Sequence, residues 1–167
     1  MRIRFVKIDE LQFLTCLKNE VWGYKTDHFQ KWEVGDFLIF LVDNNIAGVG
    51  RISGKPYVST DLVWDNGLSP HRIPVKFTHA FQKCNRLPIR GEIRKSLSHS
   101  WGPKFRRWVR TLELIEEGSA ERIIETINLN KNELPEIQIW IERYLEIAKR
   151  SRDLSIIQIA IQISWYL

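Results

Sequence analysis

The stretch DFLIFLVDNNIAGVGRI, residues 36–52, contains two apolar runs separated by a pair of asparagines. Each run has the length and residue types of a strand, and asparagine tolerates the positive φ of a tight turn, so we expect a β-hairpin. Gly48 and Gly50 interrupt the second run, where glycine indicates a bulge, a strong bend or the close approach of another segment. The hairpin therefore predicts a strongly bent, barrel-like sheet.

Further strands and one helix are expected on either side of this hairpin. Residues 3–7 (IRFVK) predict a first strand, and Asp9 is placed to cap a helix in which Leu11, Leu14 and Leu17 recur at helical spacing. After the hairpin, the strand candidates are residues 57–64, 72–81 and, as a shorter one, 88–93.

From Trp101 onward, the apolar residues recur at helical spacing. One amphipathic helix is expected around residues 105–115, a short one capped by Ser119, and a longer one that starts near Pro135. The final segment, SIIQIAIQISWYL (residues 155–167), alternates like a strand, but a helix fits it as well and we favour the helix.

This order of elements predicts an α+β fold, in which helices flank a bent sheet of five or six strands and a helical extension follows. At 167 residues and 44% hydrophobic, the chain is long enough for one main domain with a small appendage. The segment LNKNELP (residues 129–135) is the expected boundary. It divides a domain of residues 1–127 from a helical extension, residues 128–167, that packs on the domain or mediates association.

Composition argues against several classes of protein. No run approaches the ~20 apolar residues of a membrane span, and the start lacks the features of a secretory signal, so we expect no membrane partner and a cytoplasmic location. Cys16 and Cys84 are isolated and are expected to be buried thiols. The histidines are scattered, and the motifs of serine hydrolases, phosphate-binding loops and zinc peptidases are missing. We therefore expect no catalytic residues, no metal and no cofactor.

Positive charge is concentrated in one segment, because residues 81–110 contain nine Lys or Arg and a single acid, Glu92. Such clustering is typical of a surface that binds a polyanion, since phosphate neutralisation releases counterions. A solvated basic face that binds nothing specific is the alternative.

Tryptophan is frequent, with seven residues, and three of them lie beside Gly, Asp, Ser or Pro rather than inside apolar runs: Trp22, Trp64 and Trp101. Each fits either a core position or a pocket in which flat rings stack on an unpaired base. Aromatic rings would favour a methylated base, because the methyl group costs less to desolvate than a bare amine.

Residues 19–77 contain a spaced set of motifs: VWG with a histidine six residues after the tryptophan, VGD, GVGRISGKPY, a later tryptophan, and PHRI. On these motifs, roughly the first 120 residues resemble the EVE domain family, relatives of the YTH readers of N6-methyladenine in the PUA-like superfamily. The nearest resemblance is to the amino-terminal DNA-binding domain of archaeal McrB-type, modification-dependent restriction proteins. The resemblance implies a barrel-like sheet with a base-binding pocket at one end.

The resemblance also implies which residues form the pocket. Trp22 and Trp64 match two tryptophans of an aromatic cage, and the backbone carbonyl of Gly23 would accept the N6 hydrogen of a methylated adenine. The candidates for a third wall are Tyr24, Tyr57 and Leu68. The candidates for polar contacts to the base, or alternatively for turn residues, are Asp27 and His28.

The function implied is reading rather than catalysis. We expect the target base to leave its stack and enter the pocket while cations follow the phosphates; these cations are Arg90, Arg94, Lys95, Lys104, Arg106 and Arg107. The favoured target is N6-methyladenine in DNA, with a nuclease or motor as a separate partner. The alternatives are a reader of modified RNA, an adaptor or homodimerisation domain that uses the carboxy-terminal segment, and an enzyme acting on a modified base.

Overall fold

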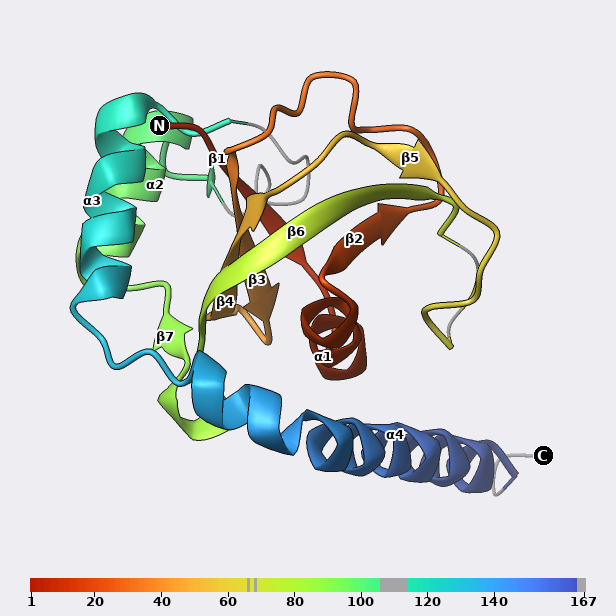
Figure 1. Ribbon diagram of the computed structural model, residues 1–167. Coiled ribbons are helices and arrows are strands. Elements are labelled where there is room, and N and C mark those ends of the chain that lie inside the picture. Colours follow the sequence, from red (N-terminus) through yellow and green to blue (C-terminus); the bar gives the residue numbers. More distant parts are fainter. Residues whose placement is uncertain (66, 68, 106–113, 165–167) are drawn as a thin grey trace.

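The computed structural model describes residues 1–65, 67, 69–105 and 114–164, with the side chains of the last helix described to residue 159 (Figure 1). The strands are β1 (Ile3–Lys7), β2 (Val21–Tyr24), β3 (Phe37–Val42), β4 (Asn45–Ile52), β5 (Tyr57–Val58), β6 (His71–Ala80) and β7 (Leu87–Pro88). The helices are α1 (Glu10–Asn19), α2 (Gly91–Trp101), α3 (Glu117–Asn128) and α4 (Leu134–Ser164), with a 3₁₀ turn at Lys83–Asn85.

One curled sheet connects the strands in the order β1-β3-β4-β6-β2. The pair β1–β3 is parallel and the other pairs are antiparallel. The two-residue strands β5 and β7 pair with β6 and β4. Among the described strands, β2 ends this order, so one of its edges is unpaired. The bent sheet with flanking helices confirms the expected α+β class.

The expected hairpin is formed by β3 and β4. The turn residues are Asp43 and Asn44, one position earlier than the expected asparagine pair, because Asn45 is already the first residue of β4. Their φ values are 51° and 62°, and a two-residue hairpin turn favours residues that tolerate positive φ. Gly50 makes room for the neighbouring strand, because a Cβ there would lie 2.3 Å from the Cγ1 atom of Val75. The glycines of β4 therefore permit close packing inside a curved sheet.

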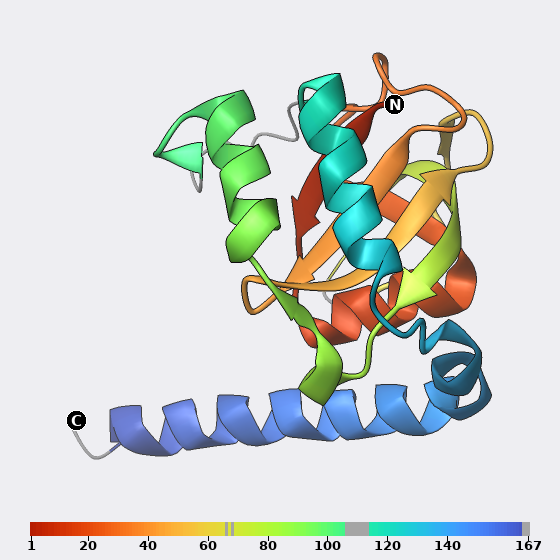
Figure 2. The ribbon, with the colours of Figure 1, turned by 90° about the vertical axis from the view of Figure 1, so that its left-hand side faces the viewer.

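Apolar side chains on the two faces of the sheet form two separate clusters. Alternation along β3 sends Leu38 and Phe40 to the cluster that contains α1 and the first half of α4, and Ile39 and Leu41 to the other. That second cluster lies beneath α2 and α3, which run side by side over the sheet (Figure 2). The sheet is thus covered on both faces, which explains the continuous apolar run of β3.

Helix caps agree with the sequence at one position and differ at another. Asp9 caps α1 as expected: its carboxylate accepts from the Gln12 N–H at 2.7 Å, and the Gln12 side chain accepts from the Asp9 N–H. Ser119 does not cap a helix, because α3 begins at Glu117 and buries Ser119 in its first turn.

Several expected elements are shorter, longer or of a different type. Residues 57–64 contain only the two-residue strand β5, and residues 88–93 contain the end of β7 and the start of α2 rather than a strand. The strand β2 was not expected. The helix expected around residues 105–115 falls largely outside the described residues.

Helix α4 is unbroken from Leu134 to Ser164, so the helix favoured for the final segment is confirmed as far as Ser164. Its first half packs against the sheet and α1 through Leu134 and Ile137. The second half of α4 extends past α1 (Figures 1 and 2). Every side chain from residue 153 to residue 159 is exposed. Within the described part of the chain, no helix is long and apolar enough to cross a membrane.

The two thiols differ in burial, which makes the expectation of two buried cysteines wrong for Cys84. Cys84 is exposed, whereas Cys16 is buried, and burial raises the pKa of the Cys16 thiol to about 12.

Because the thiolate is the reactive form, we expect one thiol per native chain to react with an aromatic disulfide reagent near pH ~8, and the second only in denaturant. Cys84→Ser should abolish the fast reaction; two fast thiols in the native chain would contradict this assignment.

Candidate nucleic-acid base site

Hydrogen bonding between β2 and β6 determines which backbone groups face the free edge of β2. The Glu20 carbonyl accepts from the Val75 N–H at 2.9 Å, so this pair is hydrogen-bonded. Bonded and non-bonded pairs alternate in an antiparallel ladder, and the next residue of β6, Pro74, has no N–H to donate. The same alternation makes the Gly23/Arg72 pair non-bonded. The N–H and C=O of Gly23 therefore point away from β6, toward the free edge.

The other side of β6 pairs with β5. The Ser59 N–H donates to the Pro70 carbonyl at 2.9 Å, which makes Tyr57 and Arg72 a hydrogen-bonded pair by the same alternation. Gly23, Arg72 and Tyr57 consequently form a row across three strands, with their Cβ directions on one face of the sheet.

Trp22 and Trp64 lie on opposite faces of β2. Successive residues of a strand point to opposite faces, so the Trp22 ring lies on the face away from the Gly23 Cβ direction. Trp64 covers the Gly23 face, with its Cη2 atom 2.5 Å from the place that a Cβ on Gly23 would take. Both tryptophans are buried, at 7% and 5% exposure. Two flat rings thus flank the strand edge toward which the Gly23 backbone points.

Both indole N–H groups are buried without a hydrogen-bond partner among the described residues. The Trp22 ring packs edge-on against Phe40, with ring centroids 6.2 Å apart. The Trp64 indole approaches the Cys16 thiol and lowers its pKa, an effect outweighed by burial, but the contact does not meet hydrogen-bond geometry. An unsatisfied buried donor costs about 1–3 kcal/mol, so each ring retains a donor that a water or ligand would satisfy.

Arg72 holds the loop that carries Trp64. Its side chain is buried, its guanidinium carbon lies 5.5 Å from the Trp64 ring centroid, and its Nε–H donates to the Ser69 carbonyl at 3.1 Å. A second N–H donates to the Asp61 carbonyl, so the loop is tied down on both sides of Trp64. Sequence reasoning did not single out Arg72; its signal was its place in the PHRI motif.

Removing the Arg72 guanidinium is expected to destabilise the chain. Arg72→Leu leaves two loop carbonyls without their donor, and we expect the free energy of unfolding in urea to fall by about 1–3 kcal/mol. Arg51→Leu is the matched control, because Arg51 also lies over a ring, at 5.1 Å from the Phe37 centroid, but is exposed. A change within about 0.5 kcal/mol is expected there, and equal effects of the two changes would refute the role of Arg72.

A polar and aromatic group adjoins the Trp22 side of β2. Tyr24 is 39% exposed and meets the His28 ring edge-on, with centroids 4.6 Å apart. His28 Nε2 is hydrogen-bonded to the Thr26 hydroxyl at 2.8 Å. The Asp27 carboxylate accepts from the Phe29 N–H, and this hydrogen bond is the main reason that its pKa is lowered. Asp27 therefore has the bonding of a turn residue, whereas Tyr24 extends the aromatic wall.

The remaining candidates for the third wall are placed differently. Tyr57 is 44% exposed and belongs to the row that contains Gly23, on the face covered by Trp64. Leu68 lies outside the described residues. Of the two described candidates, Tyr24 is therefore on the Trp22 face of the sheet and Tyr57 on the Trp64 face.

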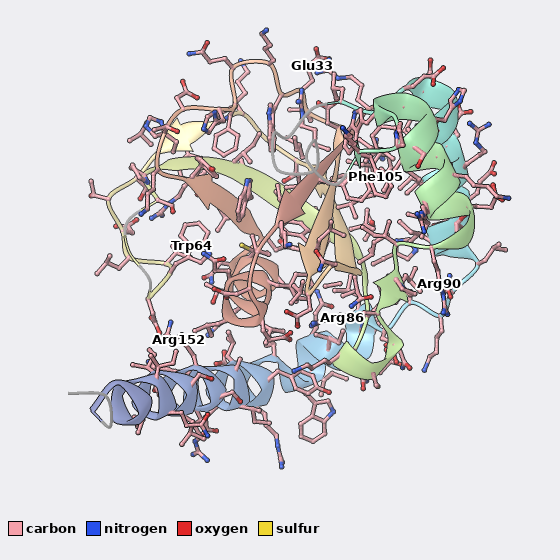
Figure 3. All side chains as sticks on the ribbon, turned by 180° about the vertical axis from the view of Figure 1, so that it is seen from behind. Glu33, Trp64, Arg86, Arg90, Phe105 and Arg152 are labelled. Carbon is pink, nitrogen blue, oxygen red and sulfur yellow. The ribbon has the colours of Figure 1, made fainter. Side chains whose placement is uncertain are left out.

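The cations that were expected to contact phosphates do not lie beside the free edge of β2. Arg90, Arg94 and Lys95 are exposed at the start of α2 and along it, and α2 lies across the sheet from β2 and β5 (Figure 1). Figure 3 shows Arg90 and Trp64 on opposite sides of the molecule. Lys104 is also exposed, and Arg106 and Arg107 lie outside the described residues. The exposed cations next to β2 and β5 in the chain are Lys25 and Lys55.

A cavity of about 590 Å³ lies elsewhere, between α1, α4 and residues 81–86. Its wall includes a partly buried ion pair, in which Arg86 meets both carboxylate oxygens of Glu10 at 2.6 and 2.7 Å. No lining residue belongs to β2 or to the Trp64 loop, so this cavity is separate from the tryptophan pair. In the described ranges, no cluster of three or more His, Cys, Asp or Glu is arranged to hold a metal.

No protein-family model matches the sequence, and no curated protein matches it. Solved structures do match. The Mmi1 YTH domain is similar over 77% of this chain and 88% of that chain, with 16% identity and a TM-score of 0.56. A complex of the YTH domain-containing protein mmi1 with RNA is similar over 76% of this chain and 81% of that chain, with 16% identity and a TM-score of 0.57. A hypothetical protein from Leishmania major is similar over 75% of this chain and 94% of that chain, with 15% identity and a TM-score of 0.51. The chain therefore has a YTH-like fold, in agreement with the expected YTH-related architecture.

Proposed function

We propose that this chain reads a modified base in nucleic acid, and that the base, N6-methyladenine, binds at the free edge of β2. One observation supports this most strongly: the Gly23 N–H and C=O point outward between two indole rings on opposite faces of the strand. A flat base that meets this edge in the plane of the sheet would stack on both rings. Its N6–H would donate to the Gly23 carbonyl, and its methyl group would contact aromatic surface.

Binding in this way requires Trp64 to move away from Gly23. The Trp64 ring now occupies the space in front of Gly23, and its loop is held by Arg72 and by an ion pair between Asp65 and Lys149 at 3.3 Å. The incoming base would replace these ring contacts with a stack worth about 1–3 kcal/mol. An N6-methyl group adds apolar area at little desolvation cost, which gives preference for the modified base.

We infer that the nucleic acid is RNA rather than DNA. One neighbour of the same fold was solved with RNA, which favours a reader of modified RNA over the reader of modified DNA expected from the sequence. Single-stranded RNA also avoids the unpairing cost of flipping a base out of duplex DNA. Lys25 and Lys55 are the cations placed to contact phosphates next to the base. The cations of α2 would contact phosphates only if the nucleic-acid strand continued from the base site around the protein to α2.

The other predictions have no comparable support. The resemblance to McrB-type proteins and the separate nuclease or motor partner stay predictions. An enzyme would need a positioned acid or base, but the Asp27 carboxylate is engaged in its turn and the Asp61 carboxylate accepts from the Ser59 hydroxyl at 2.9 Å.

Amide and indole resonances in a ¹⁵N-labelled chain test the location of the site. Adding a short single-stranded oligonucleotide with one N6-methyladenine should shift the Gly23 amide and the indole N–H signals of Trp22 and Trp64 more than the unmethylated oligonucleotide does. The indole of Trp140, exposed on α4, is the internal control and should not respond. Shifts confined to α2, with Gly23 and both buried indoles unchanged, would contradict the proposed site.

A further inference from the structure

The outward face of α4 carries a stripe of apolar side chains. Trp140, Ile147 and Leu154 recur every seven residues, Ile157 follows within one turn, and all four are more than half exposed. A different face of α4 packs on the sheet and α1; its residues there include Ile137, Ile141, Leu145 and Ala148. None of the four stripe residues belongs to that packed cluster, although Ile147 also lines the rim of the cavity between α1 and α4. An apolar stripe in water marks a contact surface.

The second half of α4 has few tertiary contacts of its own. The helix has 31 residues and a length of about 46 Å, yet every described side chain from residue 153 to residue 159 is exposed. Helical segments in water are marginally stable unless a face packs against something. A partner that covers the stripe would supply this packing.

Charge along α4 indicates what that partner is. Residues 134–146 contain three Glu and one Arg, whereas residues 147–164 contain three Lys or Arg and one Asp. Two copies of α4 in antiparallel orientation would set the acidic half of each against the basic half of the other, and a parallel pair would oppose like charges. Among the described residues, Arg143 has no ion pair, and Asp153 meets only Arg152, at 3.8 Å.

We propose that two copies of this chain associate through the outward faces of α4 in antiparallel orientation. A two-fold axis between Ala148 and Lys149 would bring Trp140 against Ile157 of the second copy, and Arg143 beside Asp153 of the second copy. Each contact occurs twice, because a two-fold interface uses the same surface on both chains. None of these residues belongs to the base site, so the proposal stands independently of the proposed function.

Mass measurement by light scattering or sedimentation tests the association. The wild type should reach twice the 19.8 kDa chain mass as concentration rises. Ile147→Glu with Leu154→Glu should weaken dimerisation by about 100-fold or more, because four apolar side chains per dimer are lost. Ile156→Glu with Ile159→Glu is the matched control, since these isoleucines are equally exposed but on the other side of the helix. A monomer at all concentrations, or equal behaviour of the two double variants, would overturn the proposal.

A charge-reversal cycle tests the orientation. Arg143→Glu and Asp153→Arg should each weaken dimerisation by about tenfold, and the two together should restore it to within about threefold of the wild type. Only the antiparallel pair places these positions next to each other across the interface. At a concentration where every form is dimeric, helix content by circular dichroism should be equal in all of them. Failure of the double variant to recover while each single variant is weakened would overturn the antiparallel arrangement.

Discussion

Phe40→Ala should lower the free energy of unfolding by about 3–5 kcal/mol. Phe40 lies on β3, an inner strand of the sheet, and is fully buried. It stacks on Phe77 with ring centroids 5.0 Å apart, and it meets Phe13 and Trp22 at 6.0 and 6.2 Å. The lost ring leaves a cavity that these rigid neighbours cannot fill. Urea unfolding followed by circular dichroism measures the change.

The control for this change is an apolar residue that packs against little. Val34 is 62% exposed, so Val34→Ala should change the free energy of unfolding by no more than about 0.5 kcal/mol. If Phe40→Ala costs no more than Val34→Ala, the first hydrophobic cluster does not pack as described. Because Phe40 also supports the Trp22 ring, its loss should weaken base binding as well.

Trp64→Ala should have the largest effect on binding. One base–aromatic stack contributes about 1–3 kcal/mol, so the affinity for a methylated oligonucleotide should fall by about 5- to 150-fold. Trp64→Phe is the matched control, because it keeps a flat ring that can stack on the base and should retain most of the affinity. Fluorescence anisotropy measures both, and unfolding curves show whether each variant is folded.

The Trp64 variants separate a base-stacking role from a core role. If Trp64 only fills the core, Trp64→Ala should reduce stability and leave the affinity of the folded fraction unchanged. Loss of affinity in a chain that remains folded under the assay conditions supports the base site.

Much of the fold follows from local sequence signals. The β3–β4 hairpin was predictable because its two apolar runs flank residues that tolerate positive φ, and α1 because Asp9 precedes a helical repeat of leucines. Other elements lacked such signals. The strand β2 has four residues including Gly23, and α2 buries only Ile93, Ser96 and Leu97, which gives little apolar periodicity.

The candidate site shows what sequence alone cannot provide. The VWG motif indicated Trp22 and Gly23, but the directions of the Gly23 backbone and of the two rings depend on the register between β2 and β6. Charge clustering in the sequence placed the phosphate contacts on α2, yet the sheet separates α2 from β2. Arg72 lies in the PHRI motif, but its role depends on contacts with the Trp64 loop, which the sequence does not show.

The measurement that tests the central claim most directly is the affinity of the wild-type chain for matched single-stranded oligonucleotides that differ by one N6-methyl group. RNA and DNA versions at two salt concentrations separate backbone attraction from base recognition, because only the former depends strongly on salt. We expect the methylated strand to bind at least about tenfold more tightly at both salt concentrations, with the preference lost in Trp64→Ala. Equal affinity for methylated and unmethylated strands would contradict a base-reading edge on β2.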